Sequence, residues 1–164
     1  MSKVITTSVA KRRIEKHSPD SFELEFTGYT SVETEAAKLI SQVKISLDLR
    51  DIHDISDEVA EFLGTHTESL DLGGLKSLSQ NAAKALAKNY RWLHMEIPEL
   101  SNDAAAELAA GKVRLKLTGL TRLDDCPGHI ALAKKLSNDR VIDRLYALKQ
   151  VAKAVSDSVP EIKK

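Results

Sequence analysis

A short apolar phrase, Leu-x-Leu or a close variant, occurs five times along the middle of the chain. Its copies are Leu24-x-Phe26, Leu47-x-Leu49, Leu70-x-Leu72, Leu93-x-Met95 and Leu115-x-Leu117. The start points advance by 23, 23, 23 and 22 residues. A unit of this length cannot bury a hydrophobic core alone and is stabilised by stacking on its neighbours. The spacing therefore predicts a solenoid.

Each copy of the phrase is followed by the signals of a turn and then of a helix. Two more apolar residues come first, and a residue at the N-cap position of a helix comes next. The expected N-caps are Glu33, Ser56, Ser79, Ser101 and Asp124, of which Glu33 is the weakest. Alternation with period two thus gives way to helical spacing inside every unit. We therefore predict an α/β fold of about five strand–turn–helix units.

This pattern resembles the leucine-rich repeat family, whose usual phrase is L-x-x-L-x-L-x-x-N-x-L. It is most similar to a bacterial-type variant, and residues 70–88 are a representative unit. The resemblance covers residues 22 to about 136 and implies a right-handed coil with a parallel sheet on one face and helices on the other. The usual Asn is replaced by apolar residues, namely Tyr29, Ile52, Leu75, Ile97 and Leu120. Without an Asn ladder, the turn amides must find other partners.

The predicted organisation has an N-terminal cap or arm at 1–21, five repeats over 22–136, and a C-terminal capping helix and tail at 137–164. The repeats are 22–45, 46–68, 69–91, 92–113 and 114–136. The ends are expected to be non-repeat caps, because terminal units must close the stack with a polar outer side. In the C-terminal region, apolar residues recur at helical spacing before Pro160, namely Val141, Ile142, Leu145, Leu148, Val151 and Val155. The fifth repeat is irregular at Cys126-Pro127-Gly128-His129, which predicts a late or kinked helix.

Composition and charge exclude several classes of protein. The chain has 24 acidic and 24 basic residues, which argues against a general nucleic-acid binder. No stretch approaches the roughly 18 apolar residues of a membrane span, and the first residues lack the apolar segment of a secretory signal. The single Cys126 cannot form an internal disulfide. We therefore expect a cytoplasmic protein that binds neither nucleic acid nor membrane.

The search for catalytic, metal or cofactor sites gives no candidate. The chain has no phosphate-binding loop, no nucleophile-elbow motif, and no paired Cys or His at metal-ligand spacing. Asp51, His53 and Asp54 cluster in one turn, where a structural role is expected. Cys126 and His129 lie three residues apart, but Pro127 and Gly128 disfavour a nucleophile–base pair. We expect no enzyme, no metal and no cofactor.

Strand alternation points the leucines of each phrase inward and their neighbours outward. Acidic side chains gather towards the first units, and Trp92 with basic side chains towards the last. The predicted partner-binding residues on this open face are Glu25, Asp48, Asp71, Trp92, His94, Arg114 and Lys116. Trp92, with Tyr90, Arg91 and Arg114, is a candidate anchor, since Trp and Arg are enriched in binding hot spots. The alternatives are that Trp92 covers a neighbouring aliphatic side chain, and that the acidic column only keeps the sheet hydrated.

Three hypotheses of function follow. The first, implied by the family resemblance, is a non-catalytic protein-interaction module that binds a protein partner on the open sheet face. Within this class, a small intracellular inhibitor or immunity-type protein would suit the size of the chain. The second is a structural solenoid that self-associates through its end faces or through a helix at 139–156. The third is an enzyme, which would need Cys126 or His129 for turnover.

Overall fold

The computed structural model describes residues 3–89, 91–138 and 150–159. Five parallel strands form one sheet, in the order in which they occur along the chain. They are β2 (Glu23–Glu25), β4 (Ser46–Asp48), β5 (Leu70–Asp71), β6 (Trp92–Met95) and β7 (Arg114–Leu117). Each is followed by a helix: α2 (Thr34–Ile40), α3 (Asp57–Leu63), α4 (Gln80–Leu86), α5 (Asn102–Ala110) and α6 (Pro127–Asn138). The chain is therefore a mixed α/β structure with parallel sheets.

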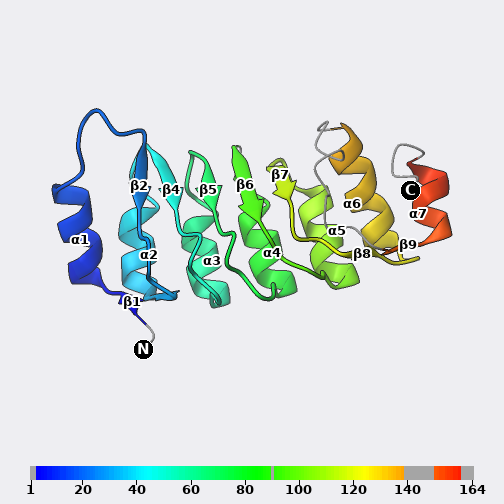
Figure 1. Cartoon of the computed structure of the whole chain (residues 1–164), viewed down its shortest axis with the longest axis horizontal. Coiled ribbons are helices and arrows are strands. Elements are labelled where there is room, and N and C mark those ends of the chain that lie inside the picture. The colour runs from blue at the N-terminus through cyan, green and yellow to red at the C-terminus, as the bar shows by residue number, and fades with distance from the viewer. Residues whose placement is uncertain (1–2, 90, 139–149, 160–164) are drawn as a thin grey trace.

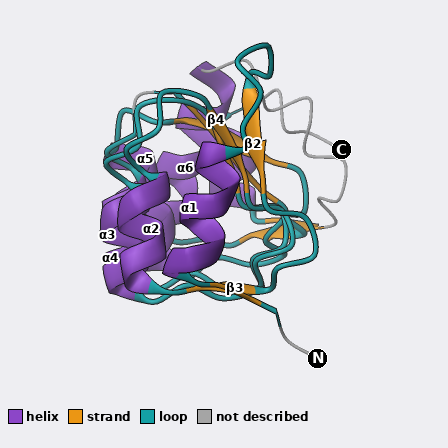
Figure 2. Ribbon diagram, turned by 90° about the vertical axis from the view of Figure 1, so that its left-hand side faces the viewer, coloured by secondary structure: helices purple, strands orange, loops and turns teal. Residues whose placement is uncertain are grey.

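Strands and helices form two layers. Figure 1 shows the strands side by side in one row, with the helices in a second row behind them. Consecutive helices pack against each other from α1 (Thr7–Glu15) to α7 (Lys153–Ser158). In the view along the rows, the helices occupy one side and the strands of the sheet the other, with loops joining them (Figure 2). The helices thus cover one face of the sheet.

The core lies between these layers and consists of the repeated leucines. The strands pair in register, so that Leu24, Leu47, Leu70, Leu93 and Leu115 are successive neighbours. All five are buried, as are their partners two residues later in each phrase. Burying one such side chain contributes roughly 1.5–3 kcal/mol. The predicted inward direction of the phrase residues is confirmed.

Serine side chains begin three of the helices as predicted. The hydroxyl oxygens of Ser56, Ser79 and Ser101 accept hydrogen bonds of 3.2, 3.0 and 3.2 Å from backbone amides in the first turn. Each removes one orphan donor, which is worth about 1 kcal/mol. Glu33 occupies the N-cap position of α2 but makes no side-chain capping bond.

The fifth helix differs from the other four at its start. Asp124 does not precede α6 directly, because this helix begins at Pro127. That is 12 residues after Leu115, whereas α3 and α4 begin 10 residues after Leu47 and Leu70. The late start that the sequence predicts is therefore confirmed, and Asp124 is corrected as a direct N-cap because two residues separate it from the helix.

Backbone hydrogen bonds satisfy the turns in place of an Asn ladder. The amides of Tyr29, Ile52 and Leu75 donate to the carbonyl oxygens three residues earlier, at 3.3, 3.0 and 3.2 Å. The next residue donates to the preceding unit, as in His53 N to Thr30 O and Lys76 N to His53 O. Apolar side chains can therefore occupy the Asn position, because the turn amides bond within the backbone.

The N-terminal segment repeats half of the unit rather than forming an unrelated cap. β1 (Val4–Ile5) pairs in parallel with β3 (Ser31–Val32), and α1 (Thr7–Glu15) packs beside α2. The N-cap Thr6 stands where Glu33 stands in the next unit. The cap or arm expected over 1–21 thus contains a helix packed on the first repeat, and its likeness to the later units was not expected. The sequence concealed it because a half unit lacks the Leu-x-Leu phrase.

The C-terminal segment also contains half of a unit. β9 (Gln150–Val151) pairs in parallel with β8 (Arg122–Leu123), and α7 (Lys153–Ser158) follows it beside α6. Within the predicted capping helix and tail at 137–164, residues 150–151 are therefore a strand and only Lys153–Ser158 of the described residues after 150 are helical. Pairing with β8 holds residues 150–151 extended, and the amide of residue 152 donates to Leu123 O at 2.8 Å. Four residues of the predicted apolar stripe, and Pro160, lie outside the described residues.

Candidate functional site

The sheet face, defined as the outward side of β2, β4, β5, β6 and β7, carries the predicted binding residues. Strand register makes Glu25, Asp48, Asp71, His94 and Lys116 consecutive neighbours across it. Trp92 and Arg114 are neighbours in a second column, two residues earlier in the last two strands. The seven residues therefore form one continuous surface. Their individual environments differ from what alternation alone suggests.

Asp48 is the residue that departs most from the expectation. It is only 3 % exposed, although it belongs to the outward column. Arg50, two residues later, donates to Asp48 Oδ1 from its backbone amide at 3.1 Å and from Nε at 2.9 Å, and its Nη2 contacts Oδ2. The hydrogen bond and charge of Asp48 raise the pKa of Arg50 above its usual range. Asp48 is thus used within the chain and has little surface to offer a partner.

Asp71 and His94 form a bridge between β5 and β6. His94 Nδ1 lies 3.0 Å from Asp71 Oδ2, and His94 Nε2 lies 3.1 Å from Thr118 Oγ1. The amide of Gly73 donates to Asp71 Oδ1 at 2.9 Å. Burial alone would raise the pKa of Asp71, but the bonds from His94 and Gly73 and the charge of Arg50 outweigh it and leave the pKa below its usual value. Asp71 therefore stays ionised and oriented at neutral pH.

Trp92 and Arg114 form a cation–π pair on the sheet face. Trp92 is half-buried and packs against the core, and the Arg114 guanidinium lies 5.9 Å from the centroid of its ring. A cation–π contact of this kind contributes about 0.5–1 kcal/mol at an exposed site. Trp92 thus combines the packing role and the exposed role that the sequence left open. Tyr90, the other ring of the predicted anchor, lies outside the described residues.

Glu25 and Lys116 lie at the two ends of the outward column. Glu25 is exposed on β2, and Lys116 is half-buried on β7. Between them, Arg50 forms an ion pair with Asp48, and His94 contacts Asp71. The carboxylate of Asp48 is therefore paired within the chain, and the sheet face is less acidic than the sequence suggests.

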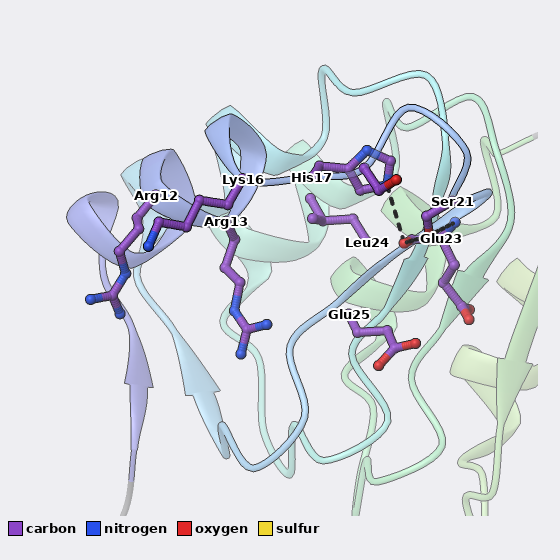
Figure 3. Close-up of a pocket in the computed structure, with 9 residues that line it drawn as sticks. Arg12, Arg13, Lys16, His17, Ser21, Glu23, Leu24 and Glu25 are labelled. Atoms are coloured by element: carbon purple, nitrogen blue, oxygen red, sulfur yellow. Dashed lines mark hydrogen bonds between the residues drawn. The ribbon is translucent and has the colours of Figure 1, made fainter.

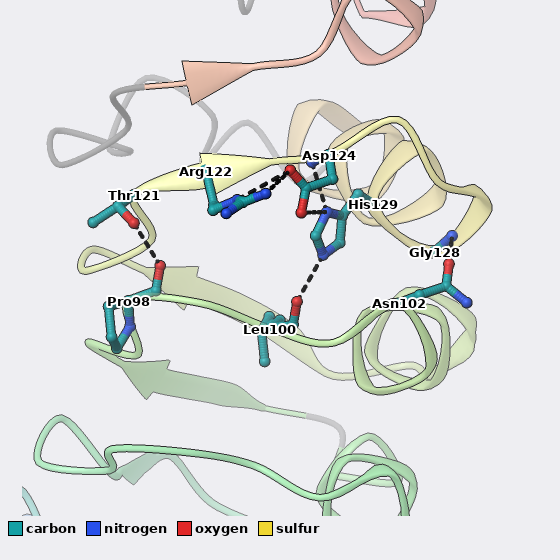
Figure 4. A network of polar contacts seen from close by, with 8 residues as sticks. All are labelled: Pro98, Leu100, Asn102, Thr121, Arg122, Asp124, Gly128 and His129. Atoms are coloured by element: carbon teal, nitrogen blue, oxygen red, sulfur yellow. Dashed lines mark hydrogen bonds and ion pairs between the residues drawn. The ribbon is translucent and has the colours of Figure 1, made fainter.

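His129 has a structural role that rules out a pair with Cys126. Its Nδ1 accepts from the amide of Asp124 at 2.7 Å, and its Nε2 donates to the carbonyl of Leu100 at 2.9 Å (Figure 4). Asp124 in turn accepts from Arg122 Nε at 3.0 Å. With both ring nitrogens engaged and the ring buried, His129 has no lone pair with which to activate a thiol.

The Asp51 cluster is structural in part, and the described residues contain no metal site. Asp51 Oδ2 accepts from the amide of Gly28 at 2.6 Å, and this bond holds the first turn, where Gly28 has φ +79°. His53 and Asp54 are exposed beside it. Among the residues that the structure describes, no three His, Cys, Asp or Glu side chains could together hold a metal ion.

Sequence reasoning missed two buried polar residues that follow successive helices at a spacing of 23. His66 Nδ1 donates to Ser41 O at 3.1 Å, and Asn89 Nδ2 donates to Glu68 O at 3.2 Å. Each ties its unit to a carbonyl of an earlier segment. The 23-residue spacing between His66 and Asn89 was a usable signal. Both residues follow a helix, however, and the family resemblance assigns no role to that part of the unit.

His66 is expected to make stability depend on pH. Its Nε2 is buried without a hydrogen-bond partner, and burial lowers the pKa of the ring from 6.5. The folded state therefore binds this proton less readily than the unfolded chain does. The contribution of neutral His66 is complete above pH 6.5 and is lost as the pH falls through the folded pKa. We expect the free energy of unfolding to fall below pH 6.5, by at most about 1.4 kcal/mol per pH unit.

Urea unfolding between pH 5 and pH 8 checks this prediction. His66→Asn, which copies the residue at position 89, should flatten the dependence between pH 5 and 6.5. The matched control is His53→Asn, because His53 is exposed. If the free energy of unfolding of the two variants changed equally with pH, the pH dependence could not be assigned to His66. Asp71 does not contribute to the pH dependence in this range, because its pKa lies below its usual value of 3.8.

Comparison with known proteins gives no relative. No family model, no curated protein and no solved structure matches the chain. Among the described helices, none combines the length and the apolar character needed to cross a membrane. Any assignment of function therefore depends on the repeat pattern and on the geometry of the sheet face.

Proposed function

We propose that this chain is a leucine-rich-repeat-like solenoid, with a right-handed coil, that acts as a non-catalytic protein-interaction module. The 23-residue phrase, the in-order parallel sheet and the matching row of helices support the architecture. In repeat proteins of this kind, each unit contacts its neighbours and the stacked strands form an extended binding surface. The engagement of both nitrogens of His129 supports the non-catalytic role.

The observation that carries the proposed function is the Trp92–Arg114 pair on the sheet face. The described helices lie on the other side of the sheet, so they leave this face accessible (Figure 2). Trp and Arg are enriched in the residues that dominate binding energy. Their ring–guanidinium contact also orders both side chains before a partner arrives, which reduces the entropy cost of binding.

The partner on this face is proposed to be a protein rather than a nucleic acid. The net charge of zero supplies no excess of cations for phosphate groups. A narrower version of the proposal is a cytoplasmic inhibitor or immunity-type protein, in which the sheet face covers a site on a toxin or enzyme. The single Cys126 supports the cytoplasmic location, because a reducing compartment requires no disulfide.

The test is an affinity capture from native cell extract, followed by titration calorimetry with the captured protein after purification. Trp92→Ala and Arg114→Glu should each weaken binding at least about tenfold, or about 1.4 kcal/mol, as expected for hot-spot residues. The matched control is Lys76→Glu, because Lys76 is exposed in a turn away from these two columns. Circular dichroism should show that all three variants remain folded.

Two outcomes would overturn the proposed site. A partner bound equally well by Trp92→Ala and by wild type would place binding outside the sheet face. A chain that captures no protein but increases in mass with concentration in sedimentation experiments would favour the structural, self-associating alternative.

A further inference from the structure

The sheet ends at β2, but the helix layer continues for one more position. Among the described residues, β2 pairs with β4 on one side only, so it is an edge strand. Beyond it α1 packs beside α2, and no described strand covers α1 (Figure 1). A half unit therefore leaves a strand position open directly beside β2.

A groove occupies this open position. It has a volume of about 500 Å³ and lies between the C-terminal half of α1 and the free edge of β2. Arg12, Arg13 and Lys16 form one wall, and Glu23, Leu24 and Glu25 form the other (Figure 3). The helix position of this layer is already taken by α1. The space therefore fits a single extended segment and not another strand–helix unit.

The backbone of β2 can pair with such a segment. The amide of Phe26 donates to Asp48 O, and the carbonyl of Phe22 accepts from Ser46 N, so both point towards β4. Because backbone groups alternate along a strand, those of Glu23 and Glu25 point to the free edge. The backbone groups of Glu23 are already engaged: its carbonyl accepts from Ser21 Oγ at 2.9 Å and from His17 Nε2 at 3.3 Å, and its amide donates to Ser21 Oγ at 3.4 Å (Figure 3). The edge at Glu25 remains accessible for pairing.

The chemistry of the groove departs from that of the repeats at one position. The seventh residue of each of the next four helices is apolar and fully buried beneath the sheet, namely Ile40, Leu63, Leu86 and Leu108. The seventh residue of α1 is Arg13, and it is exposed. In Figure 3 its side chain extends into the space between α1 and β2. Arg13 is therefore placed to contact a side chain that points inward from an added strand.

The wall formed by Glu23, Leu24 and Glu25 is acidic and therefore favours basic side chains on the added segment. Burial, followed by the nearby charge of Asp48, raises the pKa of Glu23. A cation placed next to Glu23 would stabilise its ionised carboxylate, since charges of opposite sign on neighbouring strands stabilise a sheet. Phe22, directly before β2, is 88 % exposed, whereas Val113 in the same place before β7 is fully buried. An apolar side chain beside Phe22 would cover it.

We propose that the groove between α1 and β2 binds an extended segment of a partner protein, which adds to the sheet as a further strand and presents an acidic side chain to Arg13. Its outward side chains next to Glu23 and Glu25 are Lys or Arg, and the side chain next to Phe22 is apolar. In the direction parallel to β2, from the position beside Phe22 to the position beside Glu25, the side chains of the segment are apolar, basic, acidic and basic. Main-chain hydrogen bonds supply affinity and alternate side chains supply specificity, as in other cases of strand addition. This site shares Glu25 with the sheet face but does not depend on the function proposed there.

The test uses a labelled, end-blocked peptide with the core Ile-Lys-Glu-Lys and the full-length chain. Fluorescence anisotropy should show saturable binding, and Arg13→Glu should weaken it at least tenfold. The decisive step is a charge swap: a peptide with Lys in place of its Glu should bind Arg13→Glu better than it binds wild type. Lys11→Glu is the matched control, because Lys11 is exposed on the same helix but does not line the groove.

A backbone variant distinguishes strand addition from simple charge attraction. Glu25→Pro removes an amide that faces the free edge, and proline is tolerated on edge strands. It should abolish peptide binding, whereas Glu25→Gln should weaken it only moderately. Equal binding by Arg13→Glu and wild type, or no saturation at millimolar peptide, would overturn the proposal. Concentration-dependent dimerisation that Glu25→Pro abolishes would also overturn it, because the occupant would then be a second copy of the chain.

Discussion

Replacing Leu72 by Asp is expected to unfold most of the chain at neutral pH. Leu72 is fully buried, and its amide donates to His94 O at 2.9 Å within the sheet. The variant loses about 2–5 kcal/mol of leucine packing and places an unpaired carboxylate in an apolar layer. A cost of at least about 4 kcal/mol would consume most of the stability of a typical domain, which is about 5–15 kcal/mol. Far-ultraviolet circular dichroism and urea unfolding check this result.

Two controls separate the buried charge from other effects. Lys76→Asp introduces the same side chain at an exposed position four residues later and should change stability by no more than about 0.5 kcal/mol. Leu72→Met keeps the volume and should cost less than about 1.5 kcal/mol. Asp71→Ala is not a neutral control, because Asp71 bonds to His94 and Gly73 and its loss should cost about 1 kcal/mol. A Leu72→Asp chain as stable as Lys76→Asp would refute the inward direction of Leu72.

The sequence predicted those parts of the fold that depend on short-range spacing. The burial of Leu47 and Leu70 follows from alternation along one strand, and the serine caps follow from the residue type at a helix start. The first signal recurs in all five units, and the second in three of them. The half units at the two ends were missed because residues 4–5 and 150–151 form strands only by pairing with a neighbour.

The candidate site could be predicted only in outline. Alternation placed Asp48 and His94 in one outward column, and register confirms that they belong to it. What alternation cannot supply is the partner of each charge. The bond between Arg50 and Asp48 depends on the turn of the chain after β4, and that between His94 and Asp71 on the register of two strands. These contacts decide which charges are open to a partner; the first joins residues two apart through the local turn, and the second is tertiary.

Replacing Gly74 by Ala is expected to be strongly destabilising, although alanine is normally the safer residue. A Cβ at Gly74 would lie 2.4 Å from Arg50 O and 2.8 Å from Ile52 O, both backbone atoms of the preceding unit. These carbonyls cannot move without displacing the turn to which they belong. Overpacking typically costs about 1–3 kcal/mol, and a clash with two backbone carbonyls should reach the upper end of that range. Urea unfolding of the variant measures this cost.

The adjacent glycine is a matched control, because it differs mainly in what surrounds it. A Cβ at Gly73 would meet Asp71 Oδ1 at 3.2 Å and two further side-chain atoms at 3.7 Å, and these can adjust. Neither glycine has a positive φ, so alanine is compatible with both backbones. Gly73→Ala should therefore change stability by less than about 1 kcal/mol, since lower entropy of the unfolded chain offsets part of the crowding. Equal costs at the two positions would show that units do not approach each other closely at this turn. A cost confined to Gly74 would show that close backbone approach, and not turn flexibility, explains the second glycine of the pair.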